Sequence, residues 1–111
     1  MGKDSLLRGK KGEEKAVEYL IAQGFDILER NFHSKFGEVD IIARKNGILH
    51  FIEVKSSERY EPIYAITPAK LSKILRTVEY YRMKHRSTLA YQIDALLVRK
   101  DAIELVENIS M

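Results

Sequence analysis

Residues 38–55 read EVDIIARKNGILHFIEVK, and this stretch decides the fold. Apolar and β-branched residues dominate both of its halves, which predicts strands over residues 38–44 and 48–55. The dipeptide Asn46-Gly47 between them is typical of a two-residue hairpin turn. The sequence therefore predicts an antiparallel hairpin centred on this dipeptide.

Four charged side chains interrupt this otherwise apolar hairpin. The predicted turn places Asp40 opposite Glu53, and it also places Glu38 opposite Lys55. Because side chains alternate along a strand, all four should project from one face of the hairpin. A bulge would slip the pairing, but the same-side relation of the two charges within each strand would survive. The opposite, core face should be formed by Val39, Ile41, Ala43, Ile52 and Val54.

The opposed carboxylates of Asp40 and Glu53 conflict with each other. Directly opposed residues have Cβ atoms roughly 4.5–5.5 Å apart, and like charges there are destabilising. A shared proton, compensation by Lys55 or a bound divalent cation would each relieve the conflict. Mg²⁺ is held by one or two carboxylates and keeps room for a substrate phosphate. A Glu38–Lys55 ion pair on a solvated face needs no function, but it leaves one lysine to serve three carboxylates.

The first helix is predicted before this hairpin. Helical periodicity sets in at Glu13 and ends at Gly24, a residue suited to a helix C-terminus. Glu13 is in phase with the apolar face and can point toward the sheet, whereas Glu14 is out of phase and should be solvated. Negative charge is favourable in a first helical turn, which is the ordinary explanation of Glu13. Residues 1–12 carry four basic side chains and one acid, and we expect a mobile or loosely helical basic arm.

The second helix should run from Pro68 to His85, with Thr67 as its N-cap. Its apolar stripe is formed by Leu71, Ile74, Leu75, Val78 and Tyr81, and a separate, mostly basic stripe by Lys70, Lys73, Thr77, Tyr80 and Lys84. We expect further strands over residues 25–32, 91–98 and 102–108, and loops over residues 33–37 and 56–66. The expected fold is an α/β domain with a mixed sheet flanked by helices.

Composition sets the broad class. The chain has 111 residues, which suits one domain spanning residues 1–111. It has no cysteine, so disulfides and thiolate metal sites are excluded. The formal charge is only +3, and we see neither a signal peptide nor a membrane-spanning apolar run. We therefore expect a cytoplasmic protein.

The spacing of the hairpin charges resembles a known motif. Asp40, twelve intervening residues and then Glu53-Val54-Lys55 resemble the PD-(D/E)xK signature of restriction-endonuclease-like nucleases. The stretches GEEKA, GFDILERN, GEVDIIA and FIEVK are similar to those of a widespread family of small, largely uncharacterised bacterial proteins. That family is regarded as distantly related to archaeal Holliday junction resolvases. The resemblance covers nearly the whole chain and implies a restriction-endonuclease-like three-layer core in the order αβββαββ.

The resemblance also implies roles for individual residues. Asp40 and Glu53 resemble the metal-binding acids, with the backbone carbonyl of Val54 completing the shell of Mg²⁺ or Mn²⁺. Lys55 resembles the catalytic lysine. Glu13 matches a helix-one glutamate eleven residues before the Gly-Phe that closes the helix, and it would be an outer or alternate metal ligand.

Other residues depart from the family pattern or lack a clear role. Val39 stands where the literal signature has proline, and Ser57 stands where the family often has a basic residue that would contact phosphate. Asp94 resembles a recurrent acid of a later strand, for which we expect a structural hydrogen bond. The three histidines are scattered without ligand spacing, and we expect His50 to point away from the acid face, with no metal role.

The expected partner is a polyanion, most simply DNA. Lys10 and Lys11 of the arm, and Lys70 and Lys73 of the second helix, could meet phosphates, although a basic helix face is usually only solvated. We expect an endonuclease acting on DNA, including branched or repair-intermediate DNA. The alternatives are a nucleic-acid-binding module that keeps the fold without turnover, and a protein whose acidic face docks a basic partner. The resolvases are dimers, so a homodimer is expected by analogy alone.

Overall fold

The computed structural model describes residues 2–56 and 66–110, with side chains from residue 12 onward. The elements follow the predicted order. They are α1 (Gly2–Ala22), β1 (Asp26–Ser34), β2 (Gly37–Lys45), β3 (Ile48–Ser56), α2 (Pro68–Lys84), β4 (Tyr91–Val98) and β5 (Ile103–Val106). In the described parts of the chain, no helix is both long and apolar enough to cross a membrane.

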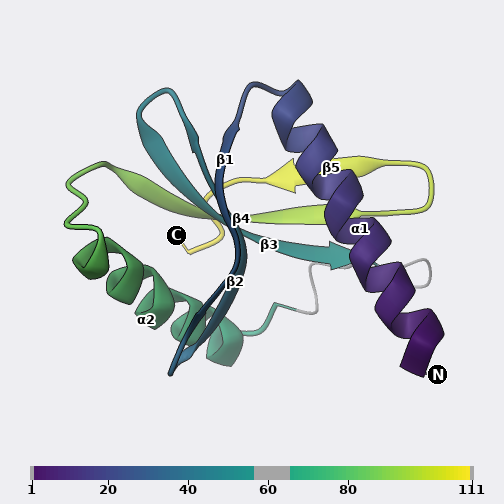
Figure 1. The fold of residues 1–111 in the computed structure, drawn as a ribbon, viewed down its shortest axis with the longest axis horizontal. Helices are drawn as coiled ribbons and strands as arrows, with labels where there is room; N and C mark the ends of the chain where they lie inside the picture. The colour runs from purple at the N-terminus through teal and green to yellow at the C-terminus, as the bar shows by residue number, and fades with distance from the viewer. Residues whose placement is uncertain (1, 57–65, 111) are drawn as a thin grey trace.

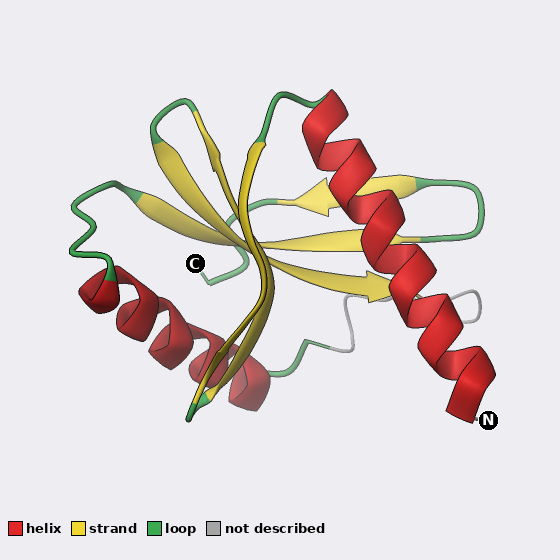
Figure 2. Cartoon of the chain, viewed as in Figure 1, coloured by secondary structure: helices red, strands yellow, loops and turns green. Residues whose placement is uncertain are grey.

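The five strands form one mixed sheet in the order β1-β2-β3-β4-β5. Only β3 and β4 pair in parallel, and α2 lies between them in the chain. The two helices pack against different hydrophobic clusters of the sheet, which Figures 1 and 2 show as one helix on either side of it. The predicted α/β domain with a mixed sheet and flanking helices is therefore confirmed.

Local signals explain where the helices begin and end. The Thr67 side chain accepts a hydrogen bond from the backbone N–H of Lys70 at 3.2 Å, and Pro68 opens α2. At the end of α1, Gly24 has φ +91°, and the N–H of Phe25 reaches back to the carbonyl of Leu20 at 3.0 Å. α1 starts at Gly2, so the backbone of the predicted basic arm is helical from that residue onward.

The central hairpin has the predicted turn. Asn46 and Gly47 have φ values of 52° and 75°, as a two-residue turn with two left-handed residues requires. The pairing runs from Lys45 opposite Ile48 as far as Ile41 opposite Ile52. It stops there, so the prediction that the ladder continues to Asp40 and Glu53 is wrong.

The expectation that Val39 and Ile41 share one core face is also wrong. Val39 packs with Phe32 in the cluster under α2, whereas Ile41 belongs to the cluster under α1, so the regular alternation of β2 breaks around Asp40. The predicted loop 33–37 is present but shorter than expected, because β1 runs to Ser34 and β2 begins at Gly37. In this tight turn Ser34 Oγ accepts the N–H of Phe36 at 3.1 Å.

Thr77 does not belong to an exposed basic stripe. It is fully buried, and its hydroxyl lies 2.8 Å from that of Ser34 while donating to the carbonyl of Lys73 at 3.1 Å. The contact between Thr77 and Ser34 holds α2 against the β1–β2 turn. Gly37 lies beside this contact, where a Cβ would meet the Cβ of Lys73 at an ordinary van der Waals distance of 3.5 Å.

Candidate active site

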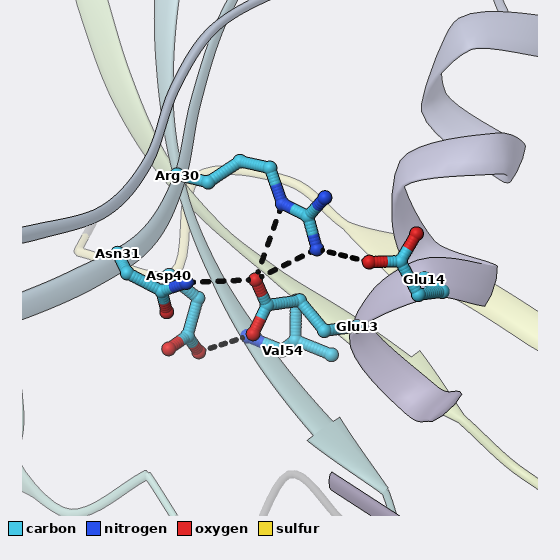
Figure 3. Close-up of polar contacts among 6 residues, drawn as sticks. All are labelled: Glu13, Glu14, Arg30, Asn31, Asp40 and Val54. Atoms are coloured by element: carbon cyan, nitrogen blue, oxygen red, sulfur yellow. Dashed lines mark hydrogen bonds and ion pairs between the residues drawn. The ribbon is translucent and has the colours of Figure 1, made fainter. Parts of the chain in front are cut away.

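The candidate site lies where β2 and β3 stop pairing. Beyond the last ladder pair, the Asp40 carboxylate takes over as the link between the strands. Its Oδ2 accepts a hydrogen bond from the backbone N–H of Val54 at 2.8 Å (Figure 3). The strands therefore diverge around a carboxylate that leaves its other oxygen available for a further partner.

Glu53 lies at the same place and is nearly buried, with 8% of its surface exposed. Its Oε1 is buried and has no hydrogen-bond partner among the described residues. An unsatisfied buried carboxylate oxygen is costly, so in a folded protein it calls for a partner such as an ordered water or an ion.

Burial and neighbouring charges shift the pKa of both carboxyl groups. Burial, followed by the charge of Asp40, raises the pKa of Glu53 to about 7. Burial also raises the pKa of Asp40, against the opposing effects of the Val54 N–H and the Lys55 charge. Near neutral pH these two carboxyl groups therefore favour the binding of a positive charge, either a proton or a cation.

Two lysines complete this corner of the molecule. The charge of Lys55 favours the ionised forms of both Asp40 and Glu53, so it lies near both. Lys70 comes from the first turn of α2, and the Lys55 amine is close enough to hydrogen-bond with it. This contact with Lys55 lowers the pKa of Lys70. The structure thus brings one of the predicted phosphate contacts directly to the acids.

The other predicted phosphate contacts stand elsewhere. Lys73 lies one turn further along α2, where its Cβ faces Gly37. The side chains of Lys10 and Lys11, as well as Ser57 and most of the predicted loop 56–66, lie outside the described residues.

Glu13 points toward the sheet, as its helical phase predicts. Its Oε1 accepts hydrogen bonds from Arg30 Nη2 at 3.1 Å and from Asn31 Nδ2 at 3.1 Å (Figure 3). Arg30 also reaches the exposed Glu14 at 2.6 Å. The negative charge of Glu13 contributes to the raised pKa of Asp40, which places it near the site.

Glu13 is not part of a tight three-carboxylate cluster with Asp40 and Glu53. Among the described residues, the group of three whose ligand atoms all lie within 4.8 Å of one another is His50, Asp94 and Glu107. With one oxygen held by Arg30 and Asn31, Glu13 is better placed to orient neighbours than to share a first coordination shell.

Glu38 does not pair with Lys55 as expected. It is exposed, and its Oε2 lies 3.2 Å from Nδ1 of the exposed His33. This contact across the β1–β2 hairpin gives Glu38 a partner, and the charge of Glu38 also contributes to the raised pKa of Asp40 and of Glu53.

Sequence reasoning missed the partnership of His50. It points away from the acids, as predicted, but its Nδ1 lies 2.6 Å from Oδ2 of the fully buried Asp94. The expected structural hydrogen bond of Asp94 is therefore present, with a histidine as one of its partners. The two residues are 44 positions apart and meet only because β3 and β4 are neighbours. No local spacing could have shown this.

Known proteins similar to this chain match it over most or all of its length. Residues 12–105 match the model of the uncharacterised protein family UPF0102. A UPF0102 protein from Campylobacter lari is 57% identical over 99% of this chain and 99% of its own length. One from Nitratiruptor sp. is 52% identical over 100% of this chain and 99% of its own. One from Helicobacter pylori strain HPAG1 is 53% identical over 93% and 90%.

Proposed function

We propose that this chain, which belongs to the uncharacterised protein family UPF0102, is a restriction-endonuclease-like enzyme that hydrolyses phosphodiester bonds in DNA with the help of Mg²⁺ or Mn²⁺. One observation carries the proposal. The buried Glu53 Oε1 has no partner among the described residues, and it lies beside the half-buried Asp40 where two strands part.

The donor set suits a hard divalent cation. Asp40 has one carboxylate oxygen beyond the Val54 contact, Glu53 has a buried oxygen without a partner, and the carbonyl of Val54 would be the third donor. All three are oxygens, which Mg²⁺ and Mn²⁺ prefer. A cation bound there would acidify a coordinated water and neutralise phosphoryl oxygens.

The two lysines suit the phosphate. Lys55 would stabilise the charge that develops at phosphorus, and Lys70 would hold the same or the adjoining phosphate. A first helical turn favours acids over lysines, yet the first turn of α2 holds Lys70 and no acid. An anion between these two amines would remove their mutual repulsion, which supports a polyanionic substrate.

Glu13 would act through its neighbours. Its contacts with Arg30 and Asn31 fix the β1 segment that flanks Asp40. In the proposal, Glu13 is therefore a positioning residue or an outer metal ligand. Lys10, Lys11 and Lys73 would contact more distant phosphates of DNA, including branched or repair-intermediate DNA, and the enzyme would act as a cytoplasmic homodimer.

The test begins with metal binding. We expect calorimetric titration with Mn²⁺ to show a binding heat for the wild-type chain that Asp40→Asn and Glu53→Gln each greatly reduce. Glu38→Gln is the matched control, because it removes a carboxylate that pairs with His33. Equal heats in the wild type and Asp40→Asn would contradict the metal site.

Turnover is tested with linear, single-stranded and four-way DNA in the presence of Mn²⁺. Cleavage that disappears in Asp40→Asn supports the enzyme. DNA binding without cleavage under any metal condition would favour the alternative, a nucleic-acid-binding module that keeps the fold.

A further inference from the structure

A second polar cluster lies on the α1 side of the sheet, apart from Asp40 and Glu53. It consists of His50 on β3, Asp94 on β4 and Glu107 just after β5. His50 is 5% exposed and Asp94 is fully buried, whereas Glu107 is exposed. Beside them is a cavity of about 400 Å³, lined among others by Tyr19, Phe25, His50 and Glu107.

The hydrogen bonds of Asp94 fix the imidazole of His50. Asp94 Oδ1 accepts from Gln92 Nε2 at 2.9 Å and from the backbone N–H of Asn108 at 3.1 Å. Its Oδ2 faces Nδ1 of His50 at 2.6 Å. A carboxylate accepts and does not donate, so Nδ1 carries the proton. In a neutral imidazole with the proton on Nδ1 the lone pair is on Nε2, and His50 lines the cavity.

The 2.6 Å contact also decides how the three residues could share an ion. A distance this short is a hydrogen bond with a proton between the atoms, and it leaves no room for an ion bound to both. Asp94 therefore orients the imidazole, as a carboxylate does behind many metal-bound histidines. Glu107 is the carboxylate that remains for a ligand.

Charges of both signs lie around the cavity. Glu107 Oε1 accepts from Gln92 Nε2 at 3.1 Å, so the two carboxylates of the cluster share one neutral amide. Lys45 also lines the cavity, but its ammonium lies over the ring of Phe25, 5.0 Å from the centroid. A ring nitrogen of His50 and a carboxylate oxygen from each of Asp94 and Glu107 come within 4.8 Å of one another.

We propose that His50 and Glu107 form a second metal site, which takes a divalent transition-metal ion such as Zn²⁺ or Co²⁺. The imidazole Nε2 and the Glu107 carboxylate are the protein ligands, and water from the cavity completes the shell. A nitrogen donor selects such ions over Mg²⁺, whereas the donors around Asp40 are all oxygens. The site does not depend on the proposed nuclease activity.

The test uses Co²⁺ as the probe and the full-length chain with Asp40→Asn, which removes the first candidate site. We expect calorimetry to show Co²⁺ binding, with a visible absorption band from the bound ion. Glu107→Gln should weaken this binding at least about 10-fold, and Asp94→Asn, which acts on the imidazole, by about 10- to 100-fold. Glu107 is exposed, so its variant should keep the thermal unfolding midpoint of its parent.

Two results would overturn the site. One is the absence of Co²⁺ binding in the Asp40→Asn protein. The other is binding of unchanged strength in both Glu107→Gln and His50→Gln. The cluster would then be a hydrogen-bonded pair whose carboxylate anchors Asn108. If this chain shows no Mn²⁺ binding at Asp40 and Glu53 but binds Co²⁺ as described, the proposed nuclease function fails and the second site stands.

Discussion

At the scale of single residues, Glu53 carries the largest electrostatic cost in the described part of the chain. Its pKa rises from 4.5 to about 7, chiefly because the side chain is buried and then because Asp40 is near. A structural acid would normally gain a partner on folding, which lowers the pKa. Glu53 shows the reverse, because burial and the charge of Asp40 outweigh its favourable contacts.

This shift predicts how stability depends on pH in the absence of metal. Between pH 4.5 and about 7 the folded state holds a proton on Glu53 that the unfolded state has lost. The free energy of unfolding should therefore fall as pH rises through this window, by up to about 3 kcal/mol. Urea denaturation in chelator at a series of pH values measures it.

The matched variants isolate this effect. Glu53→Gln should flatten most of the slope and be more stable than the wild type above pH 7. Glu38→Gln should reduce the slope only slightly, because the charge of Glu38 is the smallest of the influences on the pKa of Glu53. The raised pKa of Asp40 leaves a residual slope of the same sign. Parallel curves for the wild type and Glu53→Gln would contradict the assignment.

At the scale of elements, the predictable parts are those with local causes. The Asn46-Gly47 turn and the Thr67-Pro68 helix start follow from backbone chemistry within a few residues. The end of the β2–β3 ladder does not, because it depends on the Asp40 side chain replacing a backbone partner. The strand break therefore occurs at the residue that matters most for the site.

The first turn of α2 gives a prediction for DNA. Lys70 contacts the Lys55 amine, whereas Lys73 packs its stem over Gly37. We expect Lys70→Gln to lower the rate of DNA cleavage at least about 10-fold and Lys73→Gln to change it less, because a charge next to the reacting phosphate acts on the transition state. Rates at saturating DNA and Mn²⁺ measure this difference.

The alternative, DNA binding without cleavage, predicts a different result for Lys70→Gln and Lys73→Gln. If Lys70 serves only to attract DNA, both variants should weaken binding equally and leave the rate at saturation unchanged. That result would remove Lys70 from the site and keep it as a surface contact.

At the scale of the whole molecule, the sequence predicted the element order and the candidate acids but not their long-range partners. Periodicity placed Ala16, Leu20 and Val78 in the core, and all three are fully buried. The contacts of Thr77 with Ser34 and of His50 with Asp94 join strands and helices far apart in the chain. Such contacts depend on the tertiary arrangement, so patterns along one strand or helix cannot reveal them.

The whole fold should respond to metal, because the candidate ligands lie on two strands that have stopped pairing. A ligand at 100 times its dissociation constant adds about 2.7 kcal/mol to the free energy of unfolding if it binds only the folded state. For a chain of 111 residues this corresponds to a rise of roughly 10 °C in the unfolding midpoint. We expect saturating Mn²⁺ to produce this rise at pH 8 in the wild type and Glu38→Gln, and to produce much less in Asp40→Asn. Calorimetric melting curves measure it. An equal rise in all three proteins would place the stabilising ion elsewhere, and the unpartnered oxygen of Glu53 would then have to be explained without a metal.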